Sequence, residues 1–143
     1  MNIKILNDKA KMPTRGSEKA AGYDMYAAID EPISIPPHKS VKIPTGIAME
    51  IPDGYFVGLF PRSGISFKRG LRLSNCVAAI DSDYRGEVLI PIHNDFDHEE
   101  FIEPGERICQ FIILPYAIEE LNKVDKLSET VRGEGGFGST GEK

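Results

Sequence analysis

The stretch Asn75-Cys-Val-Ala-Ala-Ile-Asp-Ser-Asp-Tyr-Arg-Gly-Glu87 decides the fold. Residues 76–80 are short and apolar, a polar turn follows at 81–83, and apolar residues resume at Val88. An apolar run this short, bounded by turn residues, is typical of a buried strand rather than a helix. The stretch therefore predicts two strands joined by a tight turn, a hairpin, with Asp81 at the end of the first strand.

Asp81 has two interpretations on this stretch alone. Its side chain could simply cap the turn by hydrogen-bonding the backbone nearby. A carboxylate at the end of a buried strand is costly, however, unless it is paired or used in chemistry. The remainder of the chain must decide between the two.

Outward from this stretch, most of the chain has strand character. Val41, Ile43, Ile47, Met49 and Ile51 are apolar at a period of two, which is the pattern of half-buried strands. Further strands are expected at residues 3–6, 55–60, 88–92, 107–114 and 121–127.

Only one helical segment is expected, a single turn at residues 66–69. In the 88–92 strand Pro91 predicts an edge position or a bulge, because proline cannot donate to a ladder. About ten strands and no long helix predict an all-β fold, a distorted jelly-roll sandwich or barrel.

The length of 143 residues fits one domain. We expect this domain to cover residues 1–127, followed by an arm at 128–143. The arm contains Arg132-Gly-Glu-Gly-Gly-Phe-Gly-Ser-Thr-Gly141, and glycine-rich ends are usually flexible.

Composition excludes several classes of function. A net charge of -5 argues against a protein that binds nucleic acid directly or a membrane surface. No apolar run approaches membrane length, and no secretory leader is expected. Cys76 and Cys109 lie in apolar contexts without CxxC spacing, so we expect reduced core thiols in a cytoplasmic protein. The three histidines follow no metal-ligand spacing.

Polar residues in the loops are candidates for a site. Asp24 follows Gly22 closely, and Arg62 and Ser63 follow Pro61 at the end of an expected strand. A guanidinium and a hydroxyl beside exposed N–H groups can bind an anion. Each residue also has a purely structural interpretation: Asp24 as a loop carboxylate, Arg62 as a surface arginine, and Gln110 as a partner for buried backbone.

Taken together, five segments resemble the ordered motifs of the trimeric dUTPases. They cover the chain from about residue 13 to 141, with Ala78 standing where the family more often has glycine. The segments are Ala21-Gly-Tyr-Asp-Met-Tyr-Ala27, Pro61-Arg-Ser-Gly64, Ile80-Asp-Ser-Asp-Tyr-Arg-Gly-Glu87, Gly105-Glu-Arg-Ile-Cys-Gln110 and Arg132-Gly-Glu-Gly-Gly-Phe-Gly-Ser-Thr-Gly141.

The resemblance implies a magnesium-assisted dUTP diphosphatase. Members are jelly-roll homotrimers that hydrolyse dUTP to dUMP and pyrophosphate by water attack on the α-phosphorus. This reaction supplies the precursor of dTMP and keeps uracil out of DNA. The active sites lie between subunits, and the C-terminal arm of one subunit closes over a site formed by the others.

The resemblance also implies a role for each site residue. Asp81 would be the general base, Asn75 would read uracil, Tyr84 would pack under the sugar, and Asp24 would hold magnesium through water. The expected phosphate-binding and arm residues are Arg62, Ser63, Gly64, Gln110, Arg132, Phe137, Gly138, Ser139 and Thr140, with Phe137 stacking on uracil.

Three alternatives remain at this point. The first is dCTP deaminase, which shares the fold but usually lacks the Phe137–Thr140 segment. The second is a nucleotide-sensing or protein-binding module, which would not need Asp81. The third is a structural jelly-roll trimer, which leaves the arginine and glycines of the arm without a purpose.

Overall fold

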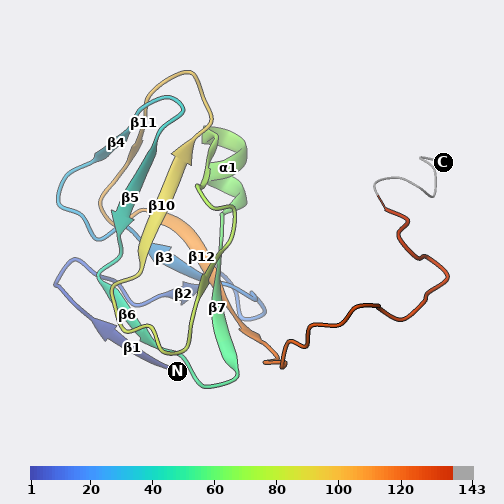
Figure 1. The fold of residues 1–143 in the computed structure, drawn as a ribbon. Coiled ribbons are helices and arrows are strands. Elements are labelled where there is room, and N and C mark those ends of the chain that lie inside the picture. The colour runs from blue at the N-terminus through green and yellow to red at the C-terminus, as the bar shows by residue number, and fades with distance from the viewer. Residues whose placement is uncertain (137–143) are drawn as a thin grey trace.

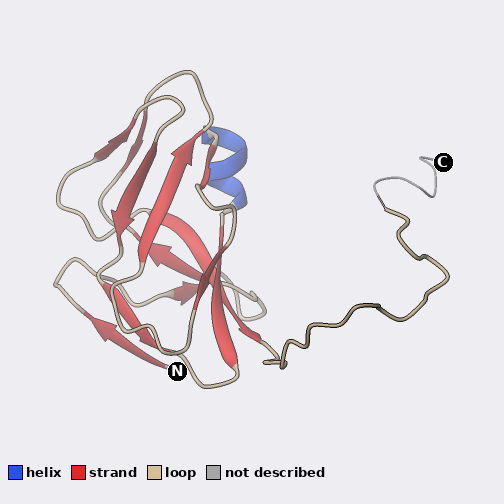
Figure 2. Cartoon of the chain, viewed as in Figure 1, coloured by secondary structure: helices blue, strands red, loops and turns tan. Residues whose placement is uncertain are grey.

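The computed structural model describes residues 1–136 and shows a body made almost entirely of antiparallel strands (Figures 1 and 2). Within those residues the strands are β1 (Asn2–Ile5), β2 (Thr14–Arg15), β3 (Tyr23–Tyr26), β4 (Ile33–Ile35), β5 (Ser40–Pro44), β6 (Ile47–Glu50), β7 (Tyr55–Phe60), β8 (Leu71–Leu73), β9 (Ala78–Ile80), β10 (Leu89–Asn94), β11 (Glu100–Ile102) and β12 (Arg107–Pro115). The expectation of an all-β fold with little helix is confirmed.

The strands form four antiparallel sheets. The largest has the order β2-β3-β12-β7-β9, and a three-stranded sheet has the order β5-β10-β8. Two strand pairs, β1-β6 and β11-β4, complete the body. Sequence neighbours such as β9 and β10 lie in different sheets, so the chain crosses between sheets repeatedly, as a jelly roll requires.

The core lies between these sheets and follows from the alternation of the strands. Along β10 the residues that point inward are Ile90, Ile92 and Asn94, all fully buried. Asn94 is tolerated there because its amide donates to the backbone oxygens of Ile35 and His98, at 2.9 and 2.8 Å. Its side chain therefore ties β10 to the neighbouring loop.

The single helix of the described chain, α1 (Ser63–Arg69), is longer than the single turn expected. Ile65 is its one buried residue and anchors it to the core. The helix ends at Gly70, which adopts φ 58°. A Cβ there would lie 2.5 Å from Cδ1 of Phe96, so only glycine allows both the left-handed turn and this close packing.

The expected hairpin at Asn75–Glu87 is wrong. β9 pairs with β7, whereas β10 pairs with β5 and β8. The loop between β9 and β10 carries the chain from one sheet to another instead of folding it back on itself. Local turn residues indicate where a strand ends, but they do not specify which strand it pairs with.

Two expectations about burial in this region are also wrong. Cys76 is an exposed thiol at φ 63°, not a core residue, because the chain turns before β9 begins. β9 itself is only half-buried in the single chain. Cys109, by contrast, is buried as expected.

Pro91 was expected on an edge strand or at a bulge, yet β10 is the central strand of its sheet. Pro91 pairs with Lys42 of β5, and the pairing with β8 begins only at Ile92. The proline is tolerated because it lies just beyond the end of the short strand β8.

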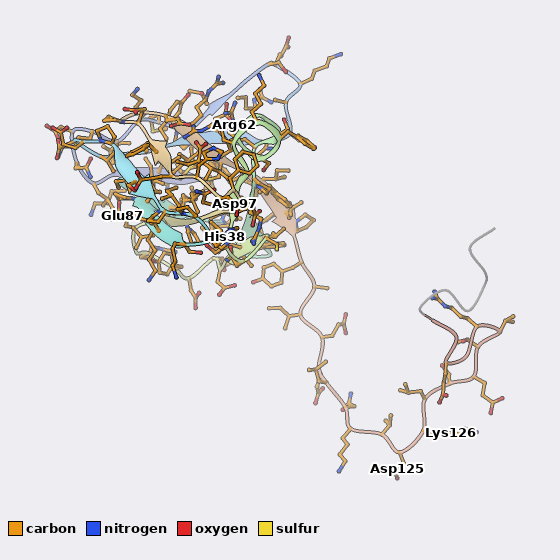
Figure 3. The ribbon with its side chains drawn as sticks, turned by 90° about the horizontal axis from the view of Figure 1, so that it is seen from above. His38, Arg62, Glu87, Asp97, Asp125 and Lys126 are labelled. Carbon is orange, nitrogen blue, oxygen red and sulfur yellow. The ribbon has the colours of Figure 1, made fainter. Side chains whose placement is uncertain are left out.

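The strand expected at residues 121–127 is absent. The last strand ends at Pro115, and the chain then runs away from the body without regular structure through residue 136 (Figures 1 and 3). No other part of the described chain provides a partner strand for this segment.

Candidate functional site

A pocket of about 290 Å³ opens beside β9 and the loop that follows it. Asn75, Asp81 and Tyr84, three residues expected to contact the nucleoside, all line it. The structure thus brings together residues from both ends of β9, with the apolar side chains of Leu59 and Ala78 between them. A mixed apolar and polar pocket of this size suits a base and a sugar.

The loop after β9 holds Tyr84 in a defined place. Its hydroxyl donates to the backbone oxygen of Glu87 at 2.9 Å, and its N–H donates to the backbone oxygen of Asp81 at 3.2 Å. Asp81 itself is exposed and has no hydrogen-bonding or ion-pair partner for its side chain among residues 1–136. The carboxylate of Asp81 is therefore available to a ligand in the pocket.

A second pocket, of about 220 Å³, brings together three residues expected to bind phosphate and the residue expected to hold magnesium. Asp24, Arg62, Ser63 and Gln110 line it together with Arg107. Asp24 and Gln110 lie directly opposite each other on the paired strands β3 and β12. Strand pairing thus unites motifs that are far apart in sequence.

The charges in the second pocket are arranged around Asp24, which is only 8% exposed. Arg62 Nε donates to Asp24 Oδ1 at 2.8 Å, and Arg107 Nη1 donates to Asp24 Oδ2 at 3.0 Å. Arg62 Nη1 also donates to the backbone oxygen of Arg107 at 3.3 Å. Two guanidiniums around one carboxylate leave a net positive charge, which suits a phosphate chain.

Gln110 is fixed by its neighbours. Its amide nitrogen donates to the backbone oxygen of Pro61 at 3.2 Å. A Cβ at Gly22 would lie 3.2 Å from Gln110 Cδ and closer still to its amide oxygen, so glycine leaves the space that the side chain occupies. Part of the structural interpretation of Gln110 is thus confirmed, although the residue also lines the pocket.

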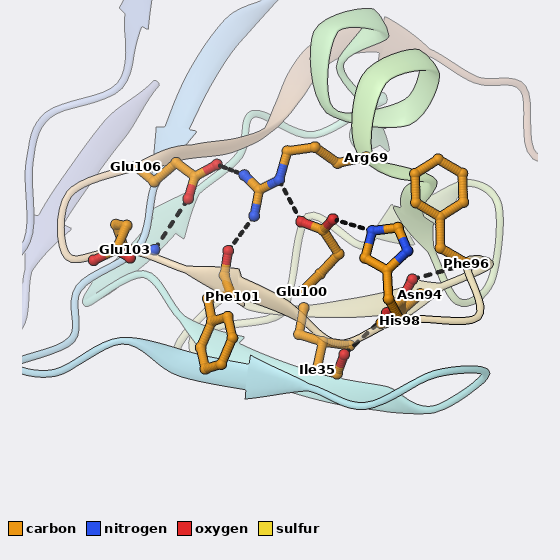
Figure 4. Close-up of polar contacts among 9 residues, drawn as sticks. All are labelled: Ile35, Arg69, Asn94, Phe96, His98, Glu100, Phe101, Glu103 and Glu106. Atoms are coloured by element: carbon orange, nitrogen blue, oxygen red, sulfur yellow. Dashed lines mark hydrogen bonds and ion pairs between the residues drawn. The ribbon is translucent and has the colours of Figure 1, made fainter.

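Behind this pocket, Arg69 at the end of α1 braces the helix against the strands (Figure 4). Its guanidinium pairs with Glu100 at 2.7 Å and with Glu106, and it donates to the backbone oxygen of Phe101. Burial alone would lower the pKa of Arg69, but the hydrogen bond to Glu100 and the charge of Glu106 raise it above its usual range. Ser63 lies on the same helix as Arg69, and Glu106 directly precedes Arg107, so this ion-pair cluster joins two elements that each contribute a residue to the second pocket.

Arg107 was not among the predicted site residues. It lies in the same expected strand as Gln110 and within the quoted Gly105–Gln110 segment. Its role depends on its side chain reaching Asp24 across the β12-β3 pairing. Only knowledge of that pairing could have identified it.

The two pockets share no lining residue. Asp81 of the first pocket lies beside Phe56, near the start of β7, whereas Arg62 of the second pocket follows the end of β7. Ala78 pairs with Leu59 and Ile80 pairs with Val57, so the direction from Ala78 to Asp81 leads away from Arg62. From Phe56, beside Asp81, to Arg62 the chain advances by six residues, about 20 Å in extended form. Figure 3 likewise shows Glu87, at the rim of the first pocket, well apart from Arg62.

The remaining expected residues are not brought to either pocket. Gly64 follows Ser63 in the first turn of α1 but lines neither pocket. Arg132 lies on the segment that leaves the body, and its Nε donates only to the nearby backbone oxygen of Gly135 at 2.7 Å. Phe137, Gly138, Ser139 and Thr140 lie outside the described residues.

The described residues offer limited ligands for a metal. Residues 1–136 contain no group of three or more His, Cys, Asp or Glu side chains placed to hold an ion. Both oxygens of Asp24 accept from an arginine, yet each has a second lone pair that can accept from water. This donor set fits a hydrated magnesium ion held mainly by a ligand's phosphates.

The histidines are surface residues, as expected. His38, His93 and His98 pair with Asp97, Asp95 and Glu100, at 2.8, 3.4 and 3.1 Å. Within the part of the chain that the structure describes, no helix has the length and apolar character needed to cross a membrane.

Comparisons with known proteins agree with this geometry. The sequence model of the dUTPase family matches residues 8–141. A deoxyuridine 5'-triphosphate nucleotidohydrolase of Finegoldia magna is 44% identical over 142 residues, 99% of each chain. Another, from Desulfitobacterium hafniense, is 46% identical over 139 residues, 96% of this chain and 92% of the relative.

Solved structures show the same relationship. The dUTPase of Staphylococcus bacteriophage 80alpha, solved with dUPNHPP, is 34% identical with a TM-score of 0.90, covering 98% of this chain and 97% of that chain. A dUTPase variant from phage phi11 of S. aureus, described with a structural Mg(II) ion, is 27% identical with a TM-score of 0.79. That likeness covers 87% of this chain and 96% of that chain.

Proposed function

The chain belongs to the dUTPase family and hydrolyses dUTP as a dUTP diphosphatase, and from this premise we propose how its residues divide the reaction. Asp81 is the general base that takes a proton from the attacking water. Asn75 and the backbone after it read the polar edge of uracil, and Tyr84 packs under the deoxyribose. The observation that carries this assignment is the convergence of all three residues on one pocket.

The phosphate chain is gripped in the second pocket. Arg62 commits Nε and Nη1 to Asp24 and to Arg107, which leaves its Nη2 to donate to a phosphate oxygen. Ser63 and Gln110, which also line this pocket, complete the grip together with the backbone of Gly64 next to Ser63. At an effective dielectric near 20, each cation close to a phosphate contributes about 4 kcal/mol of attraction, more than the distant acidic surface opposes.

We propose that magnesium, as Mg²⁺, serves as the cofactor and is held through water by Asp24. When bound, the ion would offset the negative charge of the phosphates during hydrolysis. Asp24 accepts hydrogen bonds from the ion's water shell while both arginines keep its carboxylate in one orientation. A structural Mg(II) ion is described for the phage phi11 relative, which supports the choice of metal.

The direction of the first pocket supports active sites shared between subunits of a homotrimer. With uracil at Asn75 and the sugar at Asp81, the triphosphate leaves the pocket pointing away from Arg62 of the same chain. The phosphate grip must then come from another chain. A symmetric ring of identical subunits provides such contacts with one type of interface.

The segment after β12 gives a second argument for assembly. Ile118, Leu121 and Leu127 are 84%, 93% and 80% exposed in the single chain. Apolar side chains at this density are normally covered by a partner surface. We propose that this segment lies on a neighbouring subunit and delivers residues 128–143, with Arg132, Phe137, Gly138, Ser139 and Thr140, to a site formed by the other chains.

We further propose that the enzyme acts in the cytoplasm. Both cysteines are free, which fits a reducing compartment.

Asp81→Asn tests the assignment of the base. The amide keeps the size of the side chain but cannot accept the proton, so turnover of dUTP should fall by about 10²–10⁴. Affinity for an α,β-imido analogue of dUTP, measured by calorimetry, should stay within a factor of about two of wild type. Unchanged turnover in a folded variant would contradict the role of Asp81.

A companion measurement locates the attacked atom. Hydrolysis by the wild type in ¹⁸O-labelled water should place the label in dUMP, because water attacks the α-phosphorus. Label found in pyrophosphate would mean attack at the β-phosphorus. Incubation with dCTP separates this function from that of a deaminase, because a deaminase would release ammonia.

A further inference from the structure

Two further residues, Gly86 and Glu87, lie beside the nucleoside pocket. They follow Tyr84 in the loop between β9 and β10 and belong to the same short segment as Asp81. Their contacts bear directly on where the Tyr84 ring lies.

Gly86 provides the space that the tyrosine ring occupies. A Cβ built at this position would lie 2.6 Å from Cζ of Tyr84 and closer still to its hydroxyl oxygen. No real side-chain carbon approaches a ring so closely, so any residue but glycine would displace the ring. The obstructed atoms are the far end of a half-exposed side chain, so the ring would swing while the backbone remains in place.

Glu87 holds the ring through one hydrogen bond and anchors the loop through a second. Its backbone oxygen accepts from the Tyr84 hydroxyl at 2.9 Å, and its carboxylate Oε1 accepts from the N–H of Gly46 at 2.7 Å. Gly46 is itself confined, because a Cβ there would lie 2.6 Å from Cβ of Ala10. The side chain of Glu87 therefore anchors the loop to the turn between β5 and β6.

We propose that Gly86 and Glu87 are positioning residues that set the enzyme's preference for deoxyribose over ribose. They act through Tyr84, whose ring they hold against the sugar; Glu87 lines the pocket beside Tyr84, and Gly86 does not line it. The inference rests on the proposed placement of the sugar on Tyr84. A ring fixed within its own loop excludes a 2′-hydroxyl before substrate arrives, since no ordering of the ring is needed on binding.

Gly86→Ala is the direct test, read as the ratio of kcat/KM for dUTP to kcat/KM for UTP. The displaced ring should lower this ratio by about tenfold or more, the scale on which one misplaced group changes discrimination. The ratio of dUTP to dCTP is the internal control. It depends on the uracil edge at Asn75, so it should stay at the wild-type value.

Three further variants keep the test decisive if Gly86→Ala fails to fold. Tyr84→Phe removes the hydroxyl donor and should lower the dUTP-to-UTP ratio, by less than Gly86→Ala. Glu87→Ala removes the acceptor for Gly46 and should lower the ratio too. Glu87→Gln keeps an acceptor oxygen at that position and should restore it.

The outcomes distinguish failure of the inference about Gly86 and Glu87 from failure of the proposed function. Folded variants that retain the wild-type dUTP-to-UTP ratio would overturn the inference and leave the activity and its site intact. An equal fall in the dUTP-to-UTP and dUTP-to-dCTP ratios would also overturn it, because that pattern means general loosening. A wild type that hydrolyses UTP as well as dUTP would instead reject the proposed placement of the sugar.

Discussion

Asp24 shows how much a single residue depends on partners that are distant in the sequence. Its carboxylate binds Arg62 and Arg107, contributed by the end of β7 and the start of β12. A nearly buried carboxylate between two guanidiniums is far less costly than an isolated one, and it keeps two like charges together beside a pocket. The residue types were visible in the sequence, but the sharing of one carboxylate by two arginines was not.

Cys109 gives a residue-scale prediction about pH. Burial raises the pKa of its thiol to about 12 from the usual 9.0, and the charge of Asp24 adds to the effect. Because the folded pKa lies above the unfolded one, the fold favours the neutral thiol. The stability that this contributes is complete below pH 9 and is lost as pH rises from 9 towards 12, by about 1.4 kcal/mol per pH unit.

The measurement compares the free energy of unfolding of the wild type and of Cys109→Ala at pH 7 and pH 10, at one chain concentration. The wild type should lose about 1.4 kcal/mol more than the variant between the two pH values. A thiol reagent at pH 8 should label Cys76, which is exposed, and leave Cys109 unlabelled until the protein is unfolded. Labelling of both thiols in the native protein would contradict the burial of Cys109.

At the scale of elements, alternation and turn residues predicted most strands correctly. Residues 33–51 gave β4, β5 and β6, and residues 107–114 gave β12. The hairpin at Asn75–Glu87 failed because pairing is decided by long-range packing, and β9 found a better partner in β7. The strand expected at 121–127 failed because an apolar segment becomes a strand only where another strand is available to pair with it.

The arm, residues 128–143, can be tested by deletion. Between residues 132 and 136 its contacts are local, with Gly133 N–H donating to the backbone oxygen of Thr130 at 3.1 Å. Deleting residues 132–143 should leave the melting temperature nearly unchanged, because these contacts are local. It should abolish most dUTP hydrolysis, because the deletion removes the residues proposed to close over the site. A coupled pyrophosphate assay and calorimetry measure both.

The matched control is Lys126→Gln, two residues before the arm, where Glu129 at 3.0 Å is the lysine's one ion-pair partner among residues 1–136. An exposed pair of this kind contributes little, so activity and melting temperature should both match the wild type. If the deletion lowered the melting temperature strongly, residues 132–143 would be part of the folded body rather than a closing arm.

At the scale of the whole molecule, we propose that each chain contributes only part of each site. Asp81 lies beside Phe56 near the start of β7, whereas Arg62 follows the end of β7. The apolar side chains of Ile118, Leu121 and Leu127 are left exposed by the rest of the described chain. Sequence motifs predicted several residues of both pockets, although not Arg107, because motif order is a property of the chain. They could not predict the separation of the pockets, because that depends on the direction in which β9 pairs with β7.

The most direct test of the central claim mixes two inactive variants, Asp81→Asn and Arg62→Gln. Each homotrimer lacks one half of every site, so each should show little turnover alone. The two variants are mixed in equal amounts, unfolded together and allowed to reassemble. A site is complete when an Arg62→Gln chain supplies Asp81 and the neighbouring Asp81→Asn chain supplies Arg62. Random assembly of a symmetric trimer should thus restore dUTP hydrolysis to about one quarter of the wild-type rate. If the reassembled mixture were no more active than the two variants kept apart, each chain would have to contain its own complete site, and the shared-site account would be contradicted.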